Sequence, residues 1–452
     1  MFVSLIRTLG LVTLVAATLA MLPSCSDGPA STGSPPRPVA KGNETTAPAS
    51  PPTHAAELLA FGESASRLRQ VDPIGLRPVA GRNLKLGDFA AADFSDGTND
   101  VLSPDGKLIA LPGVNSGRLS VVRMPELRMI DRFPIVRGNR FTRPEPTLLS
   151  WPRQHTIVAF AQRYMAHRAY PGTLLVIDTQ NHAVRALPLH SSVITTAAEG
   201  QRTLLLTAPV RRVGPTQLDV VGPSGRMRSL PLPDVAAGFG PGPDWDNEDV
   251  EPALLATHRF AYVASADDVV TVVNLRTLAV TEHRIVGDPA SKPLGKPLSP
   301  GSGGVMWNSG RSLVAAGRHR MLYVTNDVRP AHAGNQFMQR PVVLLDTRTW
   351  KVRQLFPHVF DEWHEHGLIY LAKGRGFDAI RGTELDVIDA SGRLMFRRQG
   401  HGLRWDHSAG VLVERGLNGA NAVQLDPRTG RVIAHLRQVQ FPFDLLRWQP
   451  PS

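Results

Sequence analysis

A hairpin motif recurs along most of this chain and constrains the fold more than any other feature. Apolar residues lead into Asp or Asn, a short polar turn follows, and aliphatic residues then resume. The Asp or Asn side chain can bond to the backbone two residues on, and Gly, where present, supplies the positive φ of the turn. The motif therefore predicts pairs of antiparallel strands. It occurs at 174–184, 271–280, 343–352, 385–394 and 423–432.

The hairpins are spaced ~40–50 residues apart, with one longer gap, and this spacing is typical of a four-stranded unit. Further apolar runs supply the remaining strands, at 108–111, 156–160, 203–206, 260–264, 321–324 and 368–371. A single four-stranded sheet cannot bury both faces, whereas several sheets stacked around an axis can. The chain is therefore predicted to fold as a repeated all-β architecture.

Two stretches carry a family resemblance. The hairpin at 423–432 is similar to the "I-D-x-x-T-G-x-V" hairpin of the quinoprotein-like and YVTN-type (WD-repeat-like) β-propellers. The stretch from Ser103 to Leu108 resembles the "S-P-D-G" turn that opens propeller blades. The resemblance covers most of 98–440 and implies a single β-propeller. It is specific for architecture and says almost nothing about activity.

Seven four-stranded blades are predicted within a propeller domain at 76–452. Segments 76–95 and 440–449 are placed to close the ring by pairing the two ends of the domain. Six or eight blades, or two stacked β-sandwiches, remain open alternatives. The predicted blades are 98–136, 145–190, 193–233, 250–287, 305–357, 358–399 and 400–438.

A short helix is predicted before the propeller. The apolar residues of 55–69, which include Leu58, Leu59, Phe61 and Leu68, show the best helical periodicity in the chain. We interpret 55–75 as a helical lead-in to the main domain.

The first residues have the layout of an export signal. Arg7 precedes an apolar run from Leu9 to Leu22, which is short for a membrane span of ~20 residues. The run ends in Leu22-Pro23-Ser24-Cys25, which resembles the lipobox of bacterial lipoproteins. That resemblance implies removal of signal peptide 1–24, fatty acylation of Cys25, and a lipid-anchored protein on the extracytoplasmic face of the cell membrane. An ordinary secretory signal followed by an incidental Cys is the alternative.

The composition around this motif agrees with an anchored protein. Cys25 is the only cysteine in the chain, so no intramolecular disulfide can form. Residues 25–54 are rich in Pro, Ser and Thr, and we expect them to act as a disordered, semi-stiff tether. The formal net charge is +11. Outside the cytoplasm, a basic surface meets anionic lipids and envelope polymers, and not nucleic acid. Solvating charge with no specific partner is the alternative.

One candidate site is an acidic loop. Asp244, Asp246 and Glu248 alternate along a stretch that follows a Gly- and Pro-rich approach. Carboxylate oxygens are ligands for Ca²⁺, although the loop lacks the Gly and spaced Glu of an EF-hand. The alternative is a loop that is acidic without binding an ion.

A second candidate site contains histidines. His364 and His366 lie two residues apart, so a strand would direct both imidazoles to one face, with Asp361 nearby. This set predicts a site for a transition metal or another divalent ion. Histidines that line a surface or channel without a metal are the alternative.

A third candidate site combines basic and aromatic residues in one predicted loop. Arg with Tyr suits an anionic or sugar-bearing ligand, and loops on a rigid scaffold commonly bind partners. A solvated loop is the alternative. The residues are Arg163, Tyr164, His167, Arg168 and Tyr170.

The sequence contains no familiar catalytic motif, neither a G-x-S-x-G elbow nor a P-loop nor H-E-x-x-H. Two hypotheses remain. The first is a non-catalytic binding or scaffolding propeller that engages an envelope protein or a glycan. The second is a metal- or quinone-dependent extracytoplasmic enzyme, which requires the histidines and the acidic loop to meet at one mouth of the ring.

Overall fold

In the computed structural model of the protein, every regular element among the described residues is a β-strand. Residues 56–452 form one compact unit. The described part contains no helix long and apolar enough to cross a membrane. The structure describes residues 57–61, 67–86, 101–113, 117–135, 145–162, 164–165, 168–169, 171–210, 212–241, 247–250, 252–264, 269–284, 312–315, 319–324, 340–365, 367–373, 384–400, 403–416, 422–436 and 444–448.

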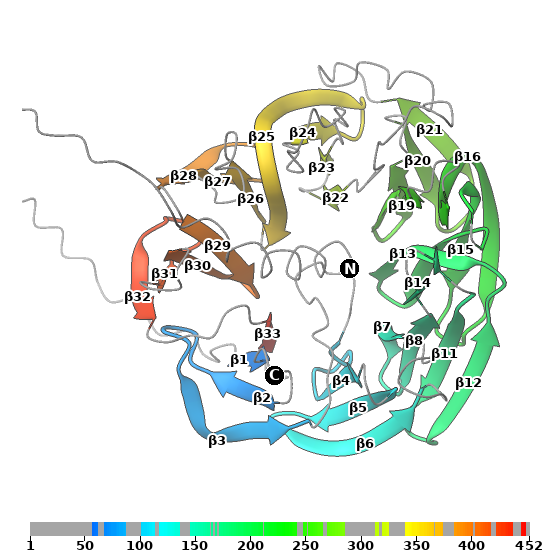
Figure 1. The fold of residues 1–452 in the computed structure, drawn as a ribbon, viewed down its shortest axis with the longest axis horizontal. Coiled ribbons are helices and arrows are strands. Elements are labelled where there is room, and N and C mark those ends of the chain that lie inside the picture. Colours follow the sequence, from blue (N-terminus) through cyan, green and yellow to red (C-terminus); the bar gives the residue numbers. More distant parts are fainter. Residues whose placement is uncertain are drawn as a thin grey trace, which may run out of the picture. The chain divides into compact units, whose positions relative to one another are not determined.

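The strands pair with their neighbours in the chain and form antiparallel meanders, which Figure 1 shows arranged around a ring. Their bounds are β1 Glu57–Phe61, β2 Arg67–Val71, β3 Pro78–Lys85, β4 Leu108–Gly113, β5 Arg118–Arg123, β6 Arg128–Pro134, β7 Glu145–Arg153, β8 Thr156–Gln162, β9 Tyr164–Met165, β10 Arg168–Ala169, β11 Thr173–Asp178, β12 Ala183–Pro188, β13 Ser192–Glu199, β14 Arg202–Ala208, β15 Gly214–Val221, β16 Met227–Pro241, β17 Asn247–Val250, β18 Ala253–Ala256, β19 Phe260–Ala264, β20 Val269–Asn274, β21 Val280–Arg284, β22 Ser312–Ala315, β23 Arg320–Val324, β24 Arg340–Asp346, β25 Lys351–Glu365, β26 Leu368–Lys373, β27 Glu384–Asp389, β28 Leu394–Gln399, β29 Leu403–Ser408, β30 Val411–Gly416, β31 Ala422–Leu425, β32 Val432–Leu436 and β33 Asp444–Trp448.

We number the sheets as blades, each from its innermost to its outermost strand in Figure 1. Blade 2 contains β4–β6, and its innermost position is held by Leu102, which bridges to Ile109. Blade 6 and blade 7 share β25, whose first residues pair with β24 and whose last residues pair with β26. The others are blade 1 (β33, β1, β2, β3), blade 3 (β7, β8, β11, β12), blade 4 (β13–β16), blade 5 (β18–β21) and blade 8 (β29–β32).

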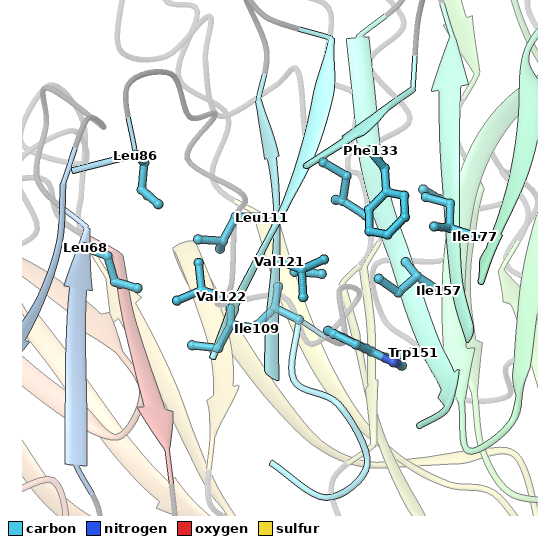
Figure 2. Packing of buried hydrophobic residues seen from close by; sticks show 14 of the residues in the cluster. Leu68, Leu86, Ile109, Leu111, Val121, Val122, Phe133, Trp151, Ile157 and Ile177 are labelled. Atoms are coloured by element: carbon cyan, nitrogen blue, oxygen red, sulfur yellow. The ribbon is translucent and has the colours of Figure 1, made fainter. Parts of the chain in front are cut away.

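The hydrophobic core lies between the faces of neighbouring blades. One cluster joins blades 1, 2 and 3, and Figure 2 shows Leu68, Leu111, Val121 and Ile157 within it. Further clusters join each later blade to the next, and the last joins blade 8 back to blade 1. Over the described residues, the core therefore runs around the whole ring, and the fold is a β-propeller.

Blade 1 closes the ring, because it combines strands from both ends of the domain. β33 pairs with β1 in the register Glu57↔Trp448 to Phe61↔Asp444. The predicted role of 440–449 in closure is confirmed at 444–448, but its partner is β1 and not the predicted segment 76–95, whose strand β3 forms the opposite edge of the same blade. Leu59 and Trp448 are both almost fully buried, so the closing pair belongs to the core.

The predicted helix at 55–69 is wrong, because this stretch forms β1 and the start of β2. Leu59 and Leu68 are core residues, but they face the core from two paired strands and not from one helical stripe. The seven predicted blades leave out the sheet of β1–β3 and β33. Eight blades, an alternative that the sequence left open, result when this sheet is added and the seven-stranded sheet is divided at β25. β3 is almost entirely exposed, and so it carries little apolar strand signal.

Candidate functional site

The two ends of the propeller are built differently. In blades 2 to 8 the first and second strands, and in every blade the third and fourth, are joined at one end, which we call the turn end. The second and third strands, and successive blades, are joined at the opposite end, which we call the loop end. This division follows from the antiparallel order of the strands.

Several short turns at the turn end are held by acidic or amide side chains. Asp178 accepts hydrogen bonds from the backbone N–H groups of Gln180 and Asn181 at 2.9 and 3.1 Å. Hydrogen bonds from the side chain and backbone of Asn181 hold the pKa of Asp178 below its ordinary value. These contacts confirm the predicted Asp-capped hairpins. Asn274, Asp346, Asp389 and Asp426 accept equivalent bonds in their own turns.

Turns between third and fourth strands also pack against the outermost strand of the preceding blade. A Cβ added at Gly430 would lie 2.5 Å from the Phe396 ring on β28. Gly225 lies against Val176 and Arg185 of blade 3 in the same way. These glycines have φ values of +68° and +75°, so both backbone conformation and space require Gly there. The turn end is therefore a locked, closely packed surface.

The loop end carries additional strands between blade strands. β9 and β10 form a small hairpin within the connection from β8 to β11, in the register Arg168↔Met165 and Ala169↔Tyr164. β16 runs beyond blade 4 and pairs with β17 in the connection to blade 5. β10 lies against β16. The hairpin inserted in blade 3 therefore lies against the strand of blade 4 that continues into the second insertion.

These two insertions carry members of two of the candidate sites. Tyr164 and Arg168, from the basic and aromatic set, lie on the β9–β10 hairpin. Glu248, from the acidic loop, lies on β17 in register with Gly240. The other members of these two sets, Arg163, His167, Tyr170, Asp244 and Asp246, lie outside the described residues, as does Cys25.

His364, from the histidine site, lies toward the turn end. Asp361 and His364 are on the second part of β25, which pairs with β26 from Val359, beside Lys373 at the loop end, to Glu365, beside Leu368 at the turn end. His364 is one residue before Glu365, the last residue of β25, and His366 lies outside the described residues. His364 therefore lies toward the turn end of its strand, whereas Glu248 lies in the connection at the loop end of blade 4. Among the described residues there is no group of three or more metal-ligating side chains, and the metal sites stay predictions.

A buried ionic cluster that no sequence motif indicates lies at the loop end of blade 7. Asp386 accepts hydrogen bonds from Arg397 Nε at 2.6 Å and Nη2 at 2.9 Å, and it also pairs with Lys373. Glu384 accepts a 2.8 Å bond from the Gln399 amide and pairs with Lys373 at 3.4 Å. Burial alone would raise the pKa of Asp386, but the bonds from Arg397 and Lys373 outweigh it and lower that pKa.

Blade 4 carries a carboxylate at the corresponding place. Asp219 is three residues before its turn, as Asp386 is before the turn that starts at Asp389. It is 1% exposed and accepts hydrogen bonds from Thr207 Oγ1 at 3.1 Å and the Gln217 amide at 2.7 Å. Both carboxylates are fully engaged in holding strands together, and we interpret them as structural.

Comparison with known protein families finds no match, and comparison with curated proteins finds none either. Solved structures show distant likeness. Dihydro-heme d1 dehydrogenase NirN in complex with DHE is 13% identical with a TM-score of 0.49, over 90% of this chain and 77% of that one. Apo AztD from Citrobacter koseri is 10% identical with a TM-score of 0.47, over 88% of this chain and 100% of that one. BamB from Moraxella catarrhalis is 12% identical with a TM-score of 0.42, over 82% and 95%. Likeness at this level carries no conclusion about activity, ligand or partner.

Proposed function

We propose that this chain is a lipid-anchored, extracytoplasmic, eight-bladed β-propeller that binds a protein of the cell envelope through its loop end. The observation that carries the proposal is the difference between the two ends. Asp-capped turns lock one end, whereas the other carries the β9–β10 and β16–β17 insertions, with β10 against β16. Insertions on a rigid scaffold are where propellers and similar folds place their binding residues.

The residue types at these insertions suit recognition. Tyr164 and Arg168 supply an aromatic ring and a guanidinium group, the side chains most enriched at the centres of protein interfaces. Glu248 adds a carboxylate on the neighbouring insertion. Such a mixed set favours a protein surface with both apolar and charged groups.

The anchor belongs to the same proposal and rests on Leu22-Pro23-Ser24-Cys25. Acylation of Cys25 would hold the propeller at the extracytoplasmic face of the cell membrane. Metabolic labelling with a radioactive fatty acid tests this point alone. The wild-type protein should incorporate the label and Cys25→Ala should not, whereas label in the variant would contradict the anchor.

The binding claim is tested by crosslinking in cells followed by affinity purification from membranes. Tyr164→Ala/Arg168→Ala changes the loop end of blade 3, and Gln180→Ala/Asn181→Ala changes the turn end of the same blade. We expect a partner protein with the wild type and the turn-end variant, and its loss with the loop-end variant. Equal recovery with both variants would contradict binding through the loop end. A crosslinked glycan in place of a protein would change the partner class.

A further inference from the structure

Exposed arginines stand at the turn end around much of the ring. They belong to the turns of blades 1, 2, 3, 4, 5 and 8, and they form no ion pair with a described carboxylate. The exposed carboxylates in the described turns at this end are Asp72 and Glu126. The arginines are Arg77, Arg128, Arg153, Arg226, Arg276 and Arg428.

Most of the other carboxylates at this end are turned inward. The Asp389 side chain is 24% exposed, whereas its partner Arg393 is 74% exposed. Asp346 is 4% exposed and Arg348 is 62% exposed. The capping role of each Asp requires this arrangement, because the carboxylate must point at the backbone N–H groups of its turn. The outermost layer of the turn end is therefore dominated by cations.

The N-terminal part of the chain joins the propeller at this same end. β1 starts at Glu57, which pairs with Trp448, and Trp448 Nε1 donates a 2.5 Å hydrogen bond to Gly106 O in a turn of blade 2. The start of β1 lies beside the end of β2, where the turn to β3 begins, and β1 runs from there toward the loop end. The proposed anchor at Cys25 therefore connects to the turn end and not to the loop end.

We propose that the turn end is a docking surface for the anionic headgroups of the membrane that carries the anchor. The inference deepens the proposed function, because it leaves the loop end facing away from the bilayer and open to a partner. A tether alone would not fix this orientation, since residues 26–54, extended at ~3.1 Å per residue, would reach roughly 90 Å. In this proposal, attraction between the turn-end arginines and the anionic headgroups fixes the orientation of the propeller. Each basic residue near an anionic bilayer strengthens binding by on the order of five-fold.

Vesicle co-sedimentation of the lipid-free mature chain, residues 26–452, tests the docking separately from the anchor. This chain keeps every described strand, including the β1–β33 pair that closes the ring. The vesicles contain phosphatidylglycerol mixed with phosphatidylcholine, and pure phosphatidylcholine is the reference. We expect binding to the anionic vesicles alone, with release at about 1 M salt, where the Debye length falls to about 3 Å.

Two charge-reversal variants locate the binding surface. The turn-end variant reverses three exposed positive charges and is Arg77→Glu/Arg226→Glu/Arg276→Glu. The loop-end variant reverses the same number of exposed positive charges and is Lys85→Glu/Arg118→Glu/Arg212→Glu. The turn-end variant should bind anionic vesicles at least about 20-fold more weakly than the loop-end variant. Equal weakening, or no binding by the wild type, would overturn the docking surface. The fatty-acid labelling of Cys25 would stand in either case.

Discussion

At the scale of single residues, the turns show what a local motif can and cannot predict. Asp178 and Asp426 cap their turns as expected, because the cap depends only on residues within the hairpin. The cluster around Asp386 could not be predicted in this way. Its partners Lys373 and Arg397 come from neighbouring strands, and their meeting depends on strand register. Within the sequence, Asp386 is one polar residue in an otherwise apolar strand.

The Gly at the tip of a turn should matter most where it meets the preceding blade. Gly430→Ala and Gly200→Ala both place Ala at a positive φ, which costs about 1 kcal/mol. Only Gly430 lies against another side chain, Phe396, so its variant adds an overpacking cost of about 1–3 kcal/mol. We expect urea unfolding to show a clearly larger loss of stability for Gly430→Ala. Equal losses would mean that the turn does not pack on blade 7 as described.

Asp386 should contribute much more to stability than the turn cap Asp389. Asp386→Asn removes the buried carboxylate from Lys373 and Arg397 and leaves them only Glu384, and this should lower the free energy of unfolding by about 2–4 kcal/mol. Asp389→Asn keeps a side-chain oxygen that can accept the backbone bonds of its turn, so a loss of about 1 kcal/mol or less is expected. Comparable losses in urea titrations of the two variants would show that the cluster is only weakly coupled.

The stabilisation by Asp386 should also depend on pH. Its pKa in the folded chain lies below the ordinary value of 3.8. The carboxylate therefore stabilises the fold fully above about pH 5, and the contribution is lost as the pH falls through the folded-state pKa. The difference in unfolding free energy between wild type and Asp386→Asn should be constant from about pH 5 to 7 and shrink below pH 4. A difference that persists unchanged at pH 2 would contradict this assignment.

At the scale of elements, strand pairs with an Asp-capped turn were predictable, and strands without one were not. β1 and β2 have apolar residues whose spacing also fits one helix face, and β3 is exposed and polar. Their strand structure is fixed from outside, by pairing with β33 at the far end of the chain. Such a long-range contact leaves no signal in a local window of sequence.

Ring closure through β33 predicts a strong effect at one residue of that strand. Trp448 is 2% exposed, lies in the shared core of blades 1 to 3 and bonds to Gly106 O. Trp448→Ala should therefore cost about 3–5 kcal/mol of unfolding free energy. Arg447→Ala in the same strand removes an exposed contact with Ala409 O and should cost about 1 kcal/mol or less. Similar melting temperatures for the two variants would argue against closure through this strand.

At the scale of the whole molecule, the repeat predicted a propeller. The strand order of the structure was needed to tell which connections lie at the turn end and which lie at the loop end. The sequence places the three candidate sites in separate segments. The structure brings the β9–β10 hairpin against β16 and carries His364 toward the opposite end. His364 and Glu248, the described members of two of these sites, therefore do not share the common mouth that the enzyme hypothesis requires. This arrangement agrees with the proposed scaffold, which has a locked turn end and an elaborated loop end.

Site-specific photocrosslinking in cells tests this account most directly. A photoreactive residue is placed at Arg168 or Glu248 at the loop end, and at Gln180 or Ser391 at the turn end. We expect adducts with a partner protein from the two loop-end positions, and none from the two turn-end positions. Partner adducts from the turn end, with none from the loop end, would contradict the proposed arrangement of the molecule.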